Sequence, residues 1–393
     1  GVLIVDGSPE GAQIWLDGAN TGKTIPYTFQ TLSPGWHTVE VREVHYTYWK
    51  KSLEIRDEQV TFANQVRLWP LQPPTLVLKQ PVTRLSTDPN DTWLAMVHAT
   101  SSGFLVGLWT GRRADPQFTS VSTTIPLTDS SIRWNQEGTS FVLNGLTQQA
   151  QTFWTNTKPS LHTDQLPNSI YGWQDTYTLL GSDDHVMTRL QTRSNRLSRE
   201  LLPPHTVFQD KELLLQTTGT SPFLYLTKKS LQEKIYQLSN LNWRPTERFQ
   251  NILILKDTNN PHWMALNFTE AHAYAGDVWG DVPRWLTDAD GNRRRGLLLH
   301  GGEAWIWEPG NDPLLVWRQA LPLRAAVWEP SGSHIILADD KKMFSLELDE
   351  RDGRQVASLA SFDEIYDLAS FDTRFYIAAK KGDQSGVWEY DPE

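Results

Sequence analysis

Residues 325–349 read AAVWEPSGSHIILADDKKMFSLELD, and this stretch decides the fold. Its first four residues are apolar and end in Trp328, and the turn Pro330-Ser331-Gly332 separates them from a second apolar run at 334–338. A charged turn follows, and residues 342–347 then alternate between polar and apolar. Aromatic and aliphatic runs between turn-forming residues are typical of short strands. The stretch therefore predicts three strands in succession.

Variants of this pattern recur along the chain, each with a central apolar strand. We anchor the repeats on one residue of that strand: Leu94, Phe141, Leu179, Leu214, Leu253, Leu298, Ile336 and Tyr376. Neighbouring anchors are about 40 residues apart, which is the period of four-stranded propeller blades. The spacing predicts a β-propeller over residues 75–393, with eight blades, or seven if the weak repeat at Leu179 or Leu214 is not a blade. The resemblance to WD-like propellers is architectural only, because no Gly-His and Trp-Asp signature repeats.

The two ends of the repeat region complement each other. The last repeat stops after Gly386–Tyr390, one strand short of a blade, while Thr75–Lys79 is an unassigned strand before the first repeat. Propellers remove exposed sheet edges by closing the ring. We therefore expect Thr75–Lys79 to pair with Val387–Tyr390 and to close the propeller.

The first 70 residues follow a different pattern, in which short strands alternate with turn residues. Asp17-Gly18 and Leu32-Ser33-Pro34-Gly35 are turns by composition. The pattern predicts a small antiparallel β-sandwich at 1–70, so the whole chain is expected to be all-β. Residues 71–74 are predicted to be a linker, because Pro73 and Pro74 cannot continue a strand ladder.

This first segment resembles the PEGA domain family. The landmarks of the family stand in order: Pro9-Glu10-Gly11-Ala12, Asp17-Gly18, Gly22 before Pro26, Leu32 with Gly35, and His37-Thr38-Val39. His45 precedes Tyr46 where the family usually has Gly-Tyr. The resemblance implies a transthyretin- or immunoglobulin-like sandwich without catalysis. It also implies a bacterial or archaeal envelope or surface protein, often with a membrane anchor just beyond the module.

Composition argues against several kinds of partner and chemistry. The net charge of −10 argues against nucleic acid, because phosphate binding needs a basic surface. Cysteine is absent, so disulfides, thiolate metal sites and cysteine nucleophiles are excluded, and an exported bacterial protein would fit this composition. No apolar run is long enough to span a membrane, so we expect attachment only through an anchor upstream of residue 1.

We predict no catalytic residue, no cofactor and no metal site. Asp288–Asn292 offers alternating oxygen ligands, but Leu299 stands where a calcium loop needs a glutamate. Gly18–Thr24 resembles a phosphate loop, yet it lacks the first glycine and no helix pattern follows. No Ser, His and Asp spacing selects a catalytic triad.

A partner-binding rim is expected on one face of the propeller. Acidic turns follow the anchor strands, and the longest connection between blades, Thr269–Pro283, opens on the same face. Loops on a rigid scaffold carry function, and tryptophan is a frequent interface anchor. A basic protein, a cation or a sugar would fit such a rim. The predicted partner-binding residues are Asp183, Asp184, Asp257, Trp279, Asp339 and Asp340.

The sequence thus favours a non-enzymatic protein on the extracellular or periplasmic side of a bacterial envelope. Its propeller face would bind a protein or glycan, and its PEGA-like module would be a membrane-proximal spacer. One alternative is a propeller enzyme, either a glycoside hydrolase or a quinoprotein. A hydrolase needs two carboxylates about 5–10 Å apart, which sequence alone does not place. Another alternative is a periplasmic assembly scaffold.

Overall fold

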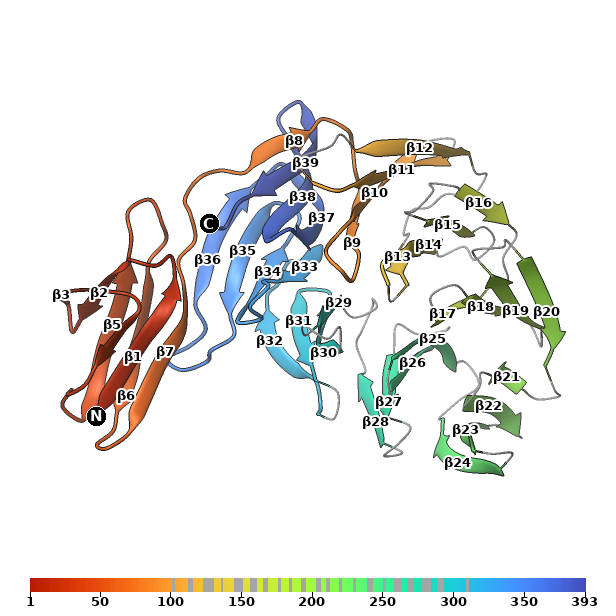
Figure 1. The fold of residues 1–393 in the computed structure, drawn as a ribbon, viewed down its shortest axis with the longest axis horizontal. Coiled ribbons are helices and arrows are strands. Elements are labelled where there is room, and N and C mark those ends of the chain that lie inside the picture. The colour runs from red at the N-terminus through yellow and green to blue at the C-terminus, as the bar shows by residue number, and fades with distance from the viewer. Residues whose placement is uncertain are drawn as a thin grey trace. The chain divides into compact units, whose positions relative to one another are not determined.

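The computed structural model describes residues 1–100 and 311–393 throughout and, between 101 and 310, the strands named below with a few adjoining residues. The secondary structure of the described residues consists of β-strands (Figure 1). None of the described segments is a helix that could cross a lipid bilayer. The chain divides into two compact units, of which the first is Gly1–Pro81 with Arg324–Glu393 and the second is Val82–Leu323.

In the first unit, the N-terminal residues form the expected sandwich of two sheets. One sheet has the order β4-β1-β7, made of β1 (Val2–Ser8), β4 (Tyr27–Phe29) and β7 (Val60–Arg67). The other has the order β3-β2-β5-β6, made of β2 (Gln13–Leu16), β3 (Ala19–Thr24), β5 (Gly35–Arg42) and β6 (Trp49–Ile55). The pair β1–β7 is parallel, and the other pairs are antiparallel. Alternate residues such as Leu3, Ile14 and Val39 face inward and build the core.

The first unit also contains two four-stranded sheets from the C-terminal part of the chain. The stretch 325–349 folds as predicted, and its sheet consists of β33 (Ala325–Trp328), β34 (His334–Ala338), β35 (Lys342–Glu347) and β36 (Val356–Ser361). The last sheet consists of β37 (Glu364–Phe371), β38 (Arg374–Lys381), β39 (Gln384–Tyr390) and β8 (Thr75–Leu78).

The strand β8 pairs with β39, which confirms the pairing predicted for these two segments. Figure 1 shows β8 beside β39. The two strands are antiparallel, and Trp388 lies opposite Leu76. A Cβ atom on Gly386 would lie 2.0 Å from the carbonyl oxygen of Leu78, so this position needs glycine for β8 to approach. The edge of β39 is thereby covered by a strand from the other end of the sequence.

The second unit contains six four-stranded antiparallel sheets, each with its strands in chain order. The first three comprise β9 (Arg84–Thr87), β10 (Leu94–Thr100), β11 (Gly103–Trp109), β12 (Gln117–Ser122); β13 (Ser131–Trp134), β14 (Ser140–Asn144), β15 (Gln151–Thr155), β16 (Leu161–Asp164); and β17 (Ser169–Asp175), β18 (Thr178–Asp183), β19 (Val186–Gln191), β20 (Arg196–Leu201). The other three comprise β21 (Thr206–Gln209), β22 (Leu213–Thr218), β23 (Ser221–Lys228), β24 (Leu231–Gln237); β25 (Trp243–Phe249), β26 (Ile252–Asp257), β27 (Trp263–Asn267), β28 (His272–Gly276); and β29 (Arg284–Thr287), β30 (Arg293–His300), β31 (Glu303–Trp307), β32 (Leu314–Arg318).

The eight anchor residues all lie on the second strand of a sheet of this kind, from Leu94 on β10 to Tyr376 on β38. Counting both units, the described strands form eight such sheets outside the sandwich. The number of blades in a closed ring stays a prediction.

Polar caps hold the turns between first and second strands. The Asp88 carboxylate accepts the main-chain N–H of Thr92 at 2.7 Å, and Asn135 Oδ1 accepts those of Thr139 at 2.9 Å and Ser140 at 3.2 Å. Asp and Asn favour such positions because their short side chains bond to the nearby main chain. These caps fix where the second, buried strand of each of these two sheets begins.

Candidate functional site

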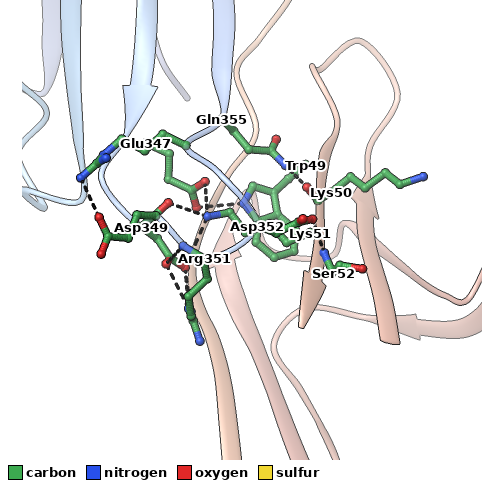
Figure 2. Close-up of polar contacts among 11 residues, drawn as sticks. Trp49, Lys50, Lys51, Ser52, Glu347, Asp349, Arg351, Asp352 and Gln355 are labelled. Carbon is green, nitrogen blue, oxygen red and sulfur yellow. Dashed lines mark hydrogen bonds and ion pairs between the residues drawn. The ribbon is translucent and has the colours of Figure 1, made fainter. Parts of the chain in front are cut away.

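A buried charged network joins the sandwich to the C-terminal sheets within the first unit. Lys51 lies on the inward side of β6 between Trp49 and Leu53, and its side chain is 0% exposed. Its Nζ lies 2.9 Å from Glu347 Oε2 and 3.5 Å from Asp349 Oδ2, and it donates to the main-chain oxygen of Asp349 at 2.6 Å. Figure 2 shows Lys51 reaching from the sandwich to the residues at the end of β35.

Glu347 is held by a second donor from the sandwich. The indole Nε1 of Trp49 donates to Glu347 Oε1 at 3.0 Å. Burial raises the pKa of Glu347, and the bonds from Trp49 and Lys51 oppose that rise. A buried charge that loses its partner destabilises a protein by several kcal/mol, so Lys51 and Glu347 each require the other. The network therefore fixes the sandwich in one position against β35.

The outer edge of β6 is covered by the turn between β35 and β36, residues 348–355. The main-chain N–H of Ser52 donates to Asp352 Oδ2 at 2.6 Å, and Gln355 Nε2 donates to the main-chain oxygen of Lys50 (Figure 2). An uncovered strand edge is a template for pairing with another chain. Two side chains of this turn thus take the place of a neighbouring strand.

A second contact lies where the chain leaves the sandwich. Trp69 is buried in the hydrophobic core of the C-terminal sheets, and its ring centroid lies 5.8 Å from that of His334. Tyr390 Oη donates to the main-chain oxygen of Pro70 at 2.8 Å. The residues just before the predicted linker are therefore packed against β34 and β39.

His334 carries no positive charge at neutral pH. Its pKa falls to about 3, first because the ring is buried and then because Arg67 and Lys51 are cationic neighbours. Arg67 is itself tied to the C-terminal segment, since its Nη2 donates to the main-chain oxygen of Pro392 at 3.1 Å. Because the His334 imidazole is neutral, it adds no third positive charge beside Lys51 and Arg67.

Ser33, His37 and Asp17 of the sandwich lie next to one another in the order of a catalytic triad. The protons on the His37 ring are placed differently from those of a triad. His37 Nδ1 lies 2.7 Å from Asp17 Oδ2, and His37 Nε2 lies 2.9 Å from the main-chain oxygen of Ser33 and 3.3 Å from its Oγ. A carbonyl oxygen only accepts, so Nε2 carries a proton and is no base for the Ser33 hydroxyl. The hydrogen bond that the His37 ring donates to the Asp17 carboxylate raises the pKa of His37. The cluster connects two turns and activates no nucleophile.

Two predicted rim residues are buried, which corrects their assignment to an exposed surface. Asp339 is 6% exposed, and its Oδ1 accepts the main-chain N–H of Lys341 at 2.8 Å and of Lys342 at 2.7 Å. Asp257, the last residue of β26, is 3% exposed. An aspartate that follows a strand can close its own hairpin by accepting the amides of the turn, as Asp339 does.

Near Asp340 the surface carries charges of both signs. Asp340 is half-buried, and its main-chain oxygen accepts the N–H of Ile365 at 2.7 Å. The N–H of Phe362 donates to Lys341 O at 2.8 Å, and the N–H of Asp363 donates to Lys380 O at 2.9 Å. The connection between β36 and β37 therefore lies beside the turn between β34 and β35 and beside the end of β38. The exposed lysines here are Lys341, Lys342, Lys380 and Lys381. In the first unit the rim is therefore mixed in charge rather than acidic.

Three other predicted site residues have side chains outside the described part of the chain. Asp183 ends β18, but its side chain lies outside the described residues, as do Asp184 and Trp279. The predicted long connection Thr269–Pro283 is not one loop, because β28 occupies its middle. The Asp288–Asn292 turn also lies outside the described residues. Within the described ranges, no three His, Asp or Glu side chains gather as a metal site.

The contact between the sandwich and the C-terminal sheets was not predicted from the sequence, although the pattern of β6 indicated it. Lys51 is one of the inward-facing residues of β6, and the other inward-facing residues of that strand are apolar. A buried lysine needs a partner. The partner could not be identified locally, because Glu347 lies 298 residues from Trp49 along the chain.

The sandwich has a relative among known domain families. Residues 1–68 match the PEGA domain. This agrees with the resemblance read from the Pro9-Glu10-Gly11-Ala12 tetrad and the landmarks after it, so the PEGA domain is the module that Lys51 fixes to β35. No curated protein matches the chain.

The repeat sheets resemble WD40 propellers of solved structure. The C-terminal WD40 domain of Sif2 aligns with 82% of this chain and 99% of its own length, at 14% identity and a TM-score of 0.51. The WD40 repeats of RRP9 align with 82% of this chain and 99% of their own length, at 9% identity and a TM-score of 0.47. Hsv2 of Kluyveromyces lactis aligns with 66% of this chain and 97% of its own length, at 12% identity and a TM-score of 0.35. The likeness to Sif2 shows the fold alone, a WD40-type propeller after the PEGA domain.

Proposed function

We propose that this chain is a non-enzymatic interaction scaffold on the extracellular or periplasmic side of a bacterial cell envelope. Residues 75–393 would form the propeller that binds a protein or glycan partner, and residues 1–70 would be the spacer that holds it. The buried Lys51–Glu347 pair carries this proposal. Domain interfaces within a chain are usually polar and permit motion, whereas this one is closed by a buried ion pair and a covered strand edge.

Two further observations support the proposal. The PEGA match supports the location, because modules of this family occur in envelope and surface proteins. The WD40-type fold supports a binding role, because loops on a rigid scaffold are where recognition residues concentrate. A spacer built this way would present the propeller in a fixed orientation rather than on a flexible tether.

The enzyme alternatives have no observation in their favour among the described residues. The triad-like cluster at His37 lacks a free base. A glycoside hydrolase or a quinoprotein is therefore not proposed. The periplasmic assembly scaffold differs from the proposed function only in its partner.

Capture from a native envelope extract tests the proposed function. The immobilised full chain should retain a partner that a Trp279→Ala/Asp340→Asn variant loses. Asp339 is left intact, because its carboxylate closes its own turn. The matched control is Glu200→Gln, an exposed change on the outer strand β20. Equal capture by the folded rim variant would overturn the rim as the binding face, and hydrolysis of an envelope polysaccharide by the native chain would overturn the non-enzymatic role.

A further inference from the structure

Three of the four sheet edges of the sandwich are protected against pairing with another strand. The edge of β6 is covered by residues 348–355. In β3, the main-chain amides of Gly22 and Lys23 donate to the side chains of Asn20 at 2.8 Å and Thr21 at 3.2 Å in the same strand. The strand β4 is only three residues long. Covering and shortening are devices by which natural sheets avoid edge-to-edge association.

The fourth edge, β7, is neither covered nor short. Its register against β1 shifts between Ala63 and Val66, and the residues from Val60 to Ala63 pair in regular register. Every residue of the sandwich is described, and β7 pairs only with β1. Its first seven residues, VTFANQV at 60–66, contain no charge and no proline. A long, uncharged edge strand of this kind is a site of strand pairing between chains.

The outer face beside this edge is apolar as well. Val60 is 48% exposed and Phe62 is 46% exposed. On β1, Val2 lies opposite Val60 and Ile4 lies opposite Phe62, and both are half-buried. The apolar surface therefore extends across two strands and ends at the open edge.

We propose that β7 is a dimer interface at which the β7 strand of a second copy of this chain pairs antiparallel about a twofold axis. The pairing would join two three-stranded sheets into one continuous sheet with the order β4-β1-β7-β7-β1-β4. Such a contact uses the same surface on both copies and closes on itself, which gives a dimer rather than a fibre. Val60 and Phe62 of each copy would contact apolar side chains of the other across the strand pair.

The charge distribution favours a second copy as the occupant. The chain has a net charge of −10, so two copies repel each other wherever acidic segments meet. The uncharged segment 60–66 can face itself without placing like charges opposite each other. The remaining repulsion acts at a distance and is screened by salt, with a Debye length of about 8–10 Å at physiological ionic strength. The dimer should therefore tighten as salt is added, whereas a partner attracted by charge would be released.

A cysteine scan of the full chain tests the interface. The natural chain has no cysteine, so each introduced thiol reports its own contacts. Of Val60→Cys, Phe62→Cys and Asn64→Cys, the variant nearest the twofold axis should form an intermolecular disulfide under mild oxidation. The matched control is Thr28→Cys on β4, the opposite edge of the same sheet, which should not cross-link. Cross-linking of Thr28→Cys as fast as of the β7 variants would overturn the proposal.

Molar mass by light scattering gives the second readout. The native chain should have twice the monomer mass, and its dimer affinity should rise with salt. Phe62→Lys places like charges at the contact and should weaken the dimer at least about tenfold, while Thr28→Lys should leave it unchanged. Phe62 is half-exposed, so circular dichroism should show that the lysine variant is folded. A native monomer at every salt concentration, or a dimer that persists in Phe62→Lys, would overturn the interface whatever the rim is found to bind.

Discussion

His37 connects two turns of the sandwich through Asp17 on one side of its ring and the main-chain oxygen of Ser33 on the other. The hydrogen bond that His37 donates to the Asp17 carboxylate raises the pKa of His37 above 6.5. A raised folded-state pKa stabilises the fold fully below the unfolded value and loses that effect as pH rises through the folded value. Asp17 is half-exposed, so the effect on the free energy of unfolding should be less than about 1 kcal/mol.

An NMR titration of the His37 ring checks this. The native chain should titrate above pH 6.5, and Asp17→Asn should bring the His37 pKa back toward that value. Stability measured by urea unfolding should then fall, from pH 6 to 9, in the native chain and hardly change in the variant. A His37 pKa at or below 6.5 in the native chain would contradict the arrangement and restore His37 as a candidate base.

At the scale of elements, the covered edge of β6 should be visible in amide exchange. Asp352→Ala removes the acceptor of the Ser52 N–H, so the Ser52 amide should exchange faster and the free energy of unfolding should fall by about 1 kcal/mol. Gln355→Ala should have a similar effect on stability by freeing the Lys50 carbonyl. Glu350→Ala, an exposed change in the same turn, is the control. Unchanged Ser52 exchange in Asp352→Ala would mean that the turn does not cover this edge.

The strands could be predicted because their signals are local and repeat. Each anchor strand is a short apolar run between turn residues, and all eight runs proved to be second strands of their sheets. The pairing of β8 with β39 could be predicted from an unassigned strand at one end and a missing strand at the other. The strand β28 was missed because its sequence, HAYAG, has small residues in place of the apolar alternation that marks the other strands.

The candidate site was harder to predict, because the burial of a side chain depends on which way it points as well as on its place in the sequence. Asp257 and Asp339 stand in turns by sequence, where an acidic residue normally faces water, yet both side chains are buried. Lys51 and Glu347 lie on strands and look like surface charges until the two strands are placed together. The charged Lys51 among the inward-facing residues of β6 was the sign in the sequence that the sandwich contacts another part of the chain.

At the scale of the whole molecule, the PEGA domain and the sheets β33–β39 share one compact unit although the sequence separates them. The sandwich has its own core, but Trp69 belongs to the core of the C-terminal sheets. The linker expected at 71–74 therefore begins after a residue that is already packed. Two segments joined in this way should lose their structure together rather than one after the other.

Breaking the buried pair tests this coupling. Lys51→Met leaves Glu347 buried without its cation, so the free energy of unfolding should fall by about 3–5 kcal/mol. Hydrogen exchange measured by mass spectrometry should show the same loss of protection in peptides from β1–β7 and from β33–β39. Lys51→Met/Glu347→Gln should recover most of the loss, because the amide oxygen of glutamine can still accept from Trp49. The control is Arg56→Met, whose exposed guanidinium pairs with the half-exposed Glu54, and it should change stability by less than about 1 kcal/mol. If the sandwich peptides lose protection while β33–β39 keep theirs, the two parts unfold separately and the rigid spacer is excluded.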